Sequence, residues 1–129
     1  MPRPSSAVPR RILIADDNRD SAESLGMLLR RMGHDVRVSF DGLDAVTAAA
    51  EFRPALILLD LGMPRLDGYG AARQIREHAA SPRPLLVAVT GWSLDEHRRR
   101  SQEAGFDVHL VKPIDLAELT RMIEGLQAD

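Results

Sequence analysis

The chain has 129 residues, contains no cysteine and carries a formal net charge of -2. This length is typical of one domain, and the lack of cysteine excludes disulfides and thiolate metal sites. The near balance of charge argues against a nucleic-acid binder, no apolar run approaches the ~18 residues of a membrane span, and the N-terminal residues lack the apolar stretch of a secretory signal. We therefore expect a cytoplasmic protein with neither a nucleic-acid nor a membrane partner.

The first part of the chain predicts two strand-helix units behind a short tail. Residues 1–9 contain prolines and serines but no periodic pattern, so they predict a disordered tail. The apolar run at residues 12–15 predicts a strand, and the apolar stripe at helical spacing over residues 22–32 predicts a helix after it. Residues 36–38 predict a second strand, and Asp41 is a suitable cap for a second helix.

The rest of the chain predicts three more units of the same kind. Residues 55–59 and 85–89 are apolar throughout, as expected for parallel strands that are buried on both faces, and residues 108–111 predict a fifth strand. The helices after these strands are predicted to start at the capping residues Asp67, Ser93 and Asp115.

Alternation of strands and helices defines the predicted fold. Right-handed crossovers turn such a chain into an α/β domain, a doubly wound parallel sheet with helices on both faces. We assign residues 10–127 to this single domain. Ligands of such sheets bind at the carboxyl ends of the strands, so the residues that follow each strand are the candidate site.

Three carboxylates, a hydroxyl and an ammonium follow the predicted strands. Asp16 and Asp17 follow the first strand, Asp60 ends the third, Thr90 ends the fourth and Lys112 follows the fifth. Lys112 is the only lysine among 17 basic residues, which makes a generic surface charge a weaker explanation for it. We expect these side chains to converge on one edge of the sheet.

This set of groups suits phosphoryl transfer assisted by Mg²⁺. Clustered carboxylates raise the cost of ionising one another, and a divalent cation with a preference for oxygen ligands removes that cost. Asp17 and Asp60 are the expected ligands, with Asp16 holding a coordinated water. The carboxylates, the ammonium of Lys112 and Mg²⁺ together are neutral. Asp60 can then attack phosphorus, while Lys112 neutralises the phosphoryl oxygens and the Thr90 hydroxyl donates a hydrogen bond to one of them.

The pattern resembles the receiver domains of two-component response regulators. The matching motifs are Asp16-Asp17, Asp60 followed by Met63-Pro64 and Asp67-Gly68, Thr90-Gly91, and Lys112-Pro113. The likeness covers about residues 10–127, and several motifs in register are far more specific than any one alone. The stretch before Lys112-Pro113 is similar to receivers of hybrid sensor kinases and to single-domain regulators.

The resemblance implies a flavodoxin-like sheet with strand order 2-1-3-4-5 and a signalling role in a phosphorelay. Asp60 would be phosphorylated by the phosphohistidine of a histidine kinase or a histidine phosphotransfer protein. The domain would assist its own phosphorylation and dephosphorylation but turn over no separate substrate. Its output would be a change in the surface built by the fourth helix, fifth strand and fifth helix, which would bind a downstream protein or a second copy of the chain.

The resemblance also assigns roles to single residues. The metal site would comprise Asp16, Asp17, Asp60 and the carbonyl of Gly62, and the peptide bond Lys112-Pro113 would be cis. Thr90 would bind the phosphate with Lys112 and move on phosphorylation as a switch residue.

One position near the site departs from the commonest receiver pattern, and two others bear on the lifetime of the phosphoryl group. The second switch residue is often Tyr or Phe, but here it is His109, which puts an aromatic rotamer switch in doubt. Gly62 and Trp92 stand where side chains could place the water that hydrolyses the phosphoryl group. Neither can act as a general base, so we expect slow self-dephosphorylation.

Two other function classes remain to be weighed. Phosphatases of the haloacid dehalogenase type also use an Asp nucleophile, a Lys and an acidic Mg²⁺ site, but their nucleophile lies on the first strand with a second Asp two residues later. Here the acidic pair comes first and position 62 is Gly, which argues against that class. A degenerate receiver that only docks partners is disfavoured by the complete set of site residues. Whether the receiver stands alone or belongs to a longer chain is left open.

Overall fold

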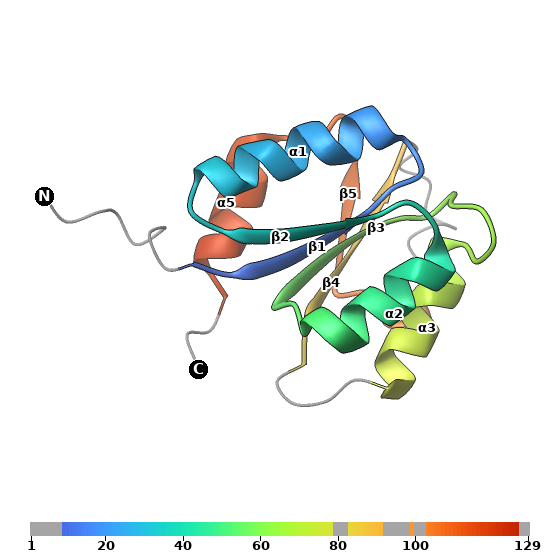
Figure 1. The fold of residues 1–129 in the computed structure, drawn as a ribbon. Helices are drawn as coiled ribbons and strands as arrows, with labels where there is room; N and C mark the ends of the chain where they lie inside the picture. The colour runs from blue at the N-terminus through green and yellow to red at the C-terminus, as the bar shows by residue number, and fades with distance from the viewer. Residues whose placement is uncertain (1–8, 79–82, 92–98, 100–102, 127–129) are drawn as a thin grey trace, which may run out of the picture.

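The computed structural model describes residues 9–78, 83–91, 99 and 103–126. Its strands are β1 (Arg11–Ala15), β2 (Asp35–Ser39), β3 (Leu56–Asp60), β4 (Leu85–Thr90) and β5 (Val108–Val111). Its helices are α1 (Arg19–Arg31), α2 (Gly42–Phe52), α3 (Gly68–His78) and α5 (Leu116–Glu124). The strands form one parallel sheet in the order β2-β1-β3-β4-β5 (Figure 1), which confirms the predicted flavodoxin-like topology.

Helices cover both faces of the sheet because the strands are apolar on both faces. Ile12 and Ile14 pack with α1 and α5, whereas Leu13, between them in sequence, packs with α2 and α3 on the opposite face (Figure 1). Both layers are buried, and the central strand β3 has four consecutive buried residues. Among the described helices, none is long and apolar enough to cross a membrane.

The helices begin at side chains that cap them. Asp41 accepts the backbone N–H of Asp44 at 2.8 Å, Asp67 accepts that of Gly70 at 2.9 Å, and Asp115 accepts that of Ala117 at 2.9 Å, as predicted. α1 begins three residues earlier than its apolar stripe, because Asn18 caps it by accepting the N–H of Ser21. The start of the fourth helix predicted at Ser93, and residues 1–8 of the predicted tail, lie outside the described residues.

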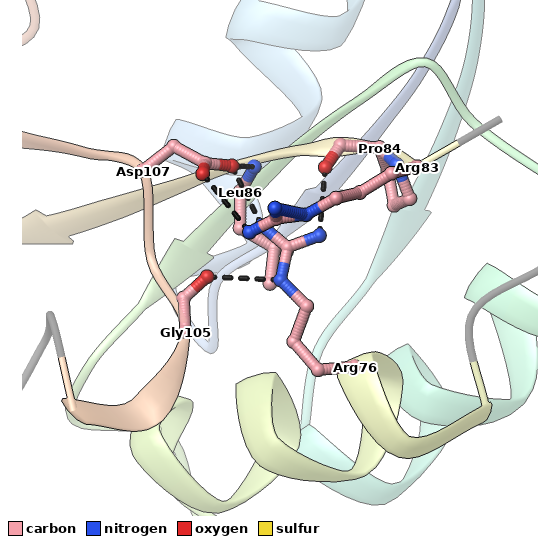
Figure 2. Close-up of polar contacts among 6 residues, drawn as sticks. All are labelled: Arg76, Arg83, Pro84, Leu86, Gly105 and Asp107. Atoms are coloured by element: carbon pink, nitrogen blue, oxygen red, sulfur yellow. Dashed lines mark hydrogen bonds and ion pairs between the residues drawn. The ribbon is translucent and has the colours of Figure 1, made fainter. Parts of the chain in front are cut away.

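A half-buried guanidinium joins α3 to the amino-terminal edge of the sheet (Figure 2). Arg76 donates hydrogen bonds to the carbonyls of Gly105 and Pro84, both at 2.9 Å, and to Asp107 Oδ2 at 2.6 Å. Asp107 also accepts the backbone N–H of Leu86 at 2.9 Å and pairs with Arg83 at 3.2 Å. This cluster, Arg76–Arg83–Asp107, ties the starts of β4 and β5 to a helix and leaves the opposite edge of the sheet to the site.

Candidate functional site

The predicted site residues meet at the carboxyl edge of the sheet. Ala15 of β1 lies beside Leu59 of β3, so Asp16 and Asp60 follow from neighbouring strands at the same level. Asp60 lies beside Val89, and Thr90 lies beside Val111, which precedes Lys112. The parallel register therefore delivers residues from four strands to one place, as the sequence predicted.

Lys112 joins two of the carboxylates. Its Nζ donates to Asp16 Oδ2 at 3.1 Å and to Asp60 Oδ2 at 3.4 Å. Asp16 is buried, and its second oxygen accepts the backbone N–H of Asn18 at 3.0 Å. Lys112 is held in place by its own backbone N–H, which donates to the carbonyl of Thr90 at 2.7 Å. The ammonium is thus fixed between two acidic groups by backbone contacts to β4.

The carboxyl group of Asp60 is held in an environment that disfavours its charge. Burial raises the pKa of Asp60, and the nearby Asp16 raises it further, although the N–H of Gly62 and the ammonium of Lys112 oppose this. Burial lowers the pKa of Lys112, but its hydrogen bonds to Asp16 and Asp60 and their negative charge outweigh it, so the pKa lies above its usual value. The site therefore keeps a protonated lysine beside an acidic group that it does not fully neutralise.

Asp17 completes a cluster that has the donor chemistry of a metal site. Oxygen atoms of Asp16, Asp17 and Asp60 lie within 4.8 Å of one another. Asp17 is exposed, Asp16 is buried and Asp60 lies between the two in exposure. Hard carboxylate oxygens with one side open to water match what Mg²⁺ requires, because it usually keeps several waters in its octahedron. The predicted ligand residues fit this cation.

The remaining site residues lie on the backbone around Asp60. The N–H of Gly62 donates to Asp60 Oδ1 at 3.1 Å, so the backbone of Gly62 contacts the Asp60 carboxylate. Thr90 is buried at the end of β4, and Gly91 after it is exposed. The peptide bond Lys112-Pro113 is cis, as predicted. The ligand role of the Gly62 carbonyl stays a prediction.

His109 lies apart from the carboxylates. It is half-buried on β5 beside Ala88 of β4, two residues before the position that pairs with Thr90. Strand alternation sends its side chain to the sheet face opposite that of Leu110, which packs toward α5. Its switch role stays a prediction, and Trp92, the predicted water-excluding residue, lies outside the described residues.

A groove of about 510 Å³ opens beside the cluster. It runs between α1 and the segment after β5, and its lining includes both Asp60 and Lys112. Apolar side chains such as Leu25, Leu28 and Ile114 make up most of the rest. The carboxylate of Asp60 therefore lies at one end of a groove with a largely apolar lining.

Sequence reasoning missed two features of this edge. It gave Asp16 a water-holding role but did not predict its direct hydrogen bond to Lys112. It also read Asp41-Gly42 only as a helix start, whereas Gly42 contacts the backbone of Leu66 in the loop after Asp60. The glycine directly after a capping residue was the available signal, since a glycine at a helix start can indicate a close approach of backbones.

Comparison with known proteins points to one family. A family model described as the response regulator receiver domain matches residues 12–124. The transcriptional regulatory protein PdtaR of Mycobacterium tuberculosis is 37% identical over 120 residues, which are 92% of this chain and 57% of that protein. The chain spans about half the length of the curated relatives it matches.

Solved structures agree with this match. The receiver domain of the sensor histidine kinase PA1611 from Pseudomonas aeruginosa, with a magnesium ion in its active-site cleft, is 34% identical, with a TM-score of 0.81 over 91% of this chain and 96% of that one. The receiver domain of Saccharomyces cerevisiae Ssk1, in complex with the histidine phosphotransfer protein Ypd1, is 28% identical, with a TM-score of 0.80 over 88% of this chain and 85% of that one.

Proposed function

The chain belongs to the response regulator receiver domain family, the phosphoacceptors of two-component signalling, and on that premise we propose that Asp60 takes a phosphoryl group from a phosphohistidine. The observation that carries the proposal is the position of Asp60 at the tip of β3, within 4.8 Å of two other carboxylate groups and 3.4 Å from Lys112. A lone surface aspartate would have none of these neighbours.

The reaction moves one phosphoryl group from nitrogen to oxygen. A carboxylate oxygen of Asp60 attacks phosphorus, the bond between phosphorus and the imidazole nitrogen breaks, and the imidazole keeps the electron pair. The chain contributes mainly position and charge, which is what phosphoryl transfer requires. Lys112 already sits within hydrogen-bond distance of Asp60 Oδ2, where its ammonium can turn toward an incoming phosphoryl oxygen. The buried hydroxyl of Thr90, on the next strand, is the proposed second donor.

Asp16, Asp17, Asp60 and the carbonyl of Gly62 are the residues that would hold Mg²⁺. Bound there, the cation would offset the negative charge of the carboxylates and of the phosphoryl oxygens. The excess of acidic groups over Lys112 supports this assignment, as does the magnesium ion in the related PA1611 receiver.

The proposed donor is a histidine kinase or a histidine phosphotransfer protein. The groove between α1 and the segment after β5 supports this, because it leads from an apolar surface to Asp60 and Lys112. Leu28 of α1 lines this groove and is an exposed apolar side chain, 44% accessible. The complex of the related Ssk1 receiver with Ypd1 is a precedent for such a partner.

The proposed output is a change of partners at the surface that includes β5 and α5. Val111 and Leu116 there are exposed apolar side chains, which suits a downstream protein or a second copy of the chain. We further propose that the domain catalyses only its own phosphorylation and dephosphorylation, that His109 and Thr90 take part in the switch, and that it works in the cytoplasm.

Phosphorylation by acetyl phosphate tests this function. The parent chain with Mg²⁺ is expected to gain one phosphoryl group that is labile to base and to hydroxylamine, whereas Asp60→Asn gains none. Asp107→Asn, which removes an acidic group at the other edge of the sheet, is the matched control and should be phosphorylated. Labelling of Asp60→Asn to the level of the parent would contradict the assignment.

A further inference from the structure

The loop that follows Asp60 is anchored at both ends near the sheet. We call residues 61–67 the acceptor loop. The N–H of Leu61 donates to the carbonyl of Val89 at 3.0 Å, and the N–H of Gly68 returns to the carbonyl of Leu61 at 3.1 Å. These bonds close the loop at its base but leave its middle to be positioned by other contacts.

The first turn of α2 meets the middle of this loop, backbone against backbone. The N–H of Gly42 points to the carbonyl of Pro64 at 3.4 Å. A Cβ atom on Gly42 would lie 1.7 Å from the carbonyl oxygen of Leu66 and 2.5 Å from its carbonyl carbon. Such distances are far inside the ~3.5–4.0 Å of optimal contact between carbon atoms, so any larger residue at position 42 must push the loop away from the helix.

Two further contacts hold the same stretch of the loop. The side chain of Leu66 extends toward α3, where a Cβ atom on Gly70 would lie 2.5 Å from its Cδ1. Arg65 has a left-handed backbone with φ of 68°, and its guanidinium reaches Asp41 Oδ2 at 3.3 Å. Since Asp41 also caps α2, one carboxylate serves both the helix start and the loop.

We propose that the start of α2 positions the acceptor loop for Mg²⁺ binding, with Gly42 as the residue that sets the distance between helix and loop. The loop carries Gly62, whose N–H orients the Asp60 carboxylate at 3.1 Å. Displacement of the loop would therefore change the geometry of the proposed metal ligands even though every acidic residue is still present. This inference rests on the proposed function, because it assumes that the acidic cluster binds Mg²⁺.

Calorimetric titration of Mg²⁺ into the parent and a series of glycine variants tests this proposal. Gly42→Ala is expected to weaken Mg²⁺ binding about tenfold or more, the range found when the supports of metal ligands are removed. Gly70→Ala should weaken it less, because the tight contacts of its new methyl are with the flexible end of Leu66, and Asp67 Oδ1 lies at an ordinary contact distance of 3.6 Å. At Mg²⁺ concentrations that restore saturation, Gly42→Ala should recover phosphorylation by acetyl phosphate, since no reacting group is missing.

Gly105→Ala is the matched control. It also inserts a methyl into a tight site, 2.8 Å from Arg76 Cγ, at a residue with φ of 104°, but at the opposite edge of the sheet. It should lower the melting temperature yet bind Mg²⁺ as the parent does. If Gly42→Ala does not fold, Leu66→Ala serves as the test variant instead. This substitution removes the side chain that packs against Gly70 without inserting an atom, and it should also weaken Mg²⁺ binding.

The possible outcomes distinguish failure of the positioning role of Gly42 from failure of the proposed Mg²⁺ site. Parent-like Mg²⁺ affinity in folded Gly42→Ala, or in Leu66→Ala where it is the variant used, would overturn the positioning role. Equal weakening in Gly42→Ala and Gly105→Ala would overturn it as well, because the effect would then follow stability alone. A parent chain that binds no Mg²⁺ would instead overturn the metal site of the proposed function.

Discussion

The two edges of the sheet carry charged clusters of opposite character. At the amino edge, Arg76 has three acceptors at 2.6–2.9 Å, and Asp107 is bonded to two guanidinium groups and a backbone N–H (Figure 2). At the carboxyl edge, a single ammonium, that of Lys112, stands among three carboxylates, and its contacts with two of them are longer, at 3.1 and 3.4 Å. One cluster is saturated with partners, whereas the other is left with excess negative charge.

The number of hydrogen-bond partners distinguishes a cluster that stabilises the fold from a cluster that is suited to bind a ligand. Part-buried charges stabilise a protein only when their hydrogen-bonding capacity is filled, and Asp107 meets that condition. Asp60 accepts hydrogen bonds from the Gly62 N–H and from Lys112, yet burial still raises its pKa. A carboxyl group with a raised pKa beside two other carboxylates, in a site open to solvent, is typical of functional sites.

Substitution of each basic side chain by the other type, Lys112→Arg at one edge and Arg76→Lys at the other, should give the largest difference between the two edges. Lys112→Arg is expected to slow phosphorylation by acetyl phosphate about a hundredfold or more, because a planar guanidinium cannot place a point charge at the phosphoryl oxygens. The reciprocal exchange, Arg76→Lys, should leave phosphorylation intact but destabilise the fold by about 1–3 kcal/mol, because one ammonium cannot reach all three acceptors. Unfolding by urea measures the loss of stability, and the rate of phosphorylation measures the loss of function. If Lys112→Arg is phosphorylated as fast as the parent, any positive charge at position 112 is sufficient.

Mg²⁺ should stabilise the chain through the carboxyl edge alone. At about ten times its dissociation constant, the cation is expected to add about 1.4 kcal/mol to the free energy of unfolding, by mass action. Asp17→Asn should abolish this gain, whereas Asp107→Asn should retain it. Thermal melts with and without Mg²⁺ provide the measurement. A gain that survives in Asp17→Asn would place the cation elsewhere.

Acidic pH should lower the stability of the fold through His34, at the amino edge of the sheet, and this effect should be smaller than the preceding ones. This residue is buried, and its Nδ1 accepts the backbone N–H of Arg10 at 3.1 Å. Burial, and then the charge of Arg10, lower the pKa of His34 below its usual 6.5. The fold therefore keeps the imidazole neutral, so its contribution to stability is complete above pH 6.5 and is lost as the pH falls below that value.

The slope of stability against pH that His34 adds is at most about 1.4 kcal/mol per pH unit. His34→Asn, whose side-chain oxygen can replace Nδ1 as the acceptor, should flatten the pH dependence of the melting temperature in the window below pH 6.5. Parallel curves for the parent and the variant in this window would show that His34 does not titrate with unfolding.

Local signals explain why one edge was predictable from sequence and the other was not. The strands, the caps at Asp41, Asp67 and Asp115, and the convergence of Asp60 with Lys112 follow from periodicity, capping chemistry and parallel register. Arg76 sits in a helix that also carries exposed charges, and its partners lie 8, 29 and 31 residues later in the chain, so no spacing rule identifies it. His34 likewise has no local signal in the sequence, since its burial depends on how Arg10, before β1, meets the turn after α1.

Melting of Asp60→Asn and Asp107→Asn in the absence of divalent cations tests the central claim most directly. A carboxyl group whose pKa is raised by the fold destabilises it when ionised, so at neutral pH Asp60→Asn should melt at a higher temperature than the parent. Asp107→Asn should melt at a lower temperature, with a loss of about 1–3 kcal/mol, because it weakens charge-assisted hydrogen bonds at a saturated cluster. A lower melting temperature for both variants would contradict the account, since Asp60 would then be a structural carboxylate like Asp107.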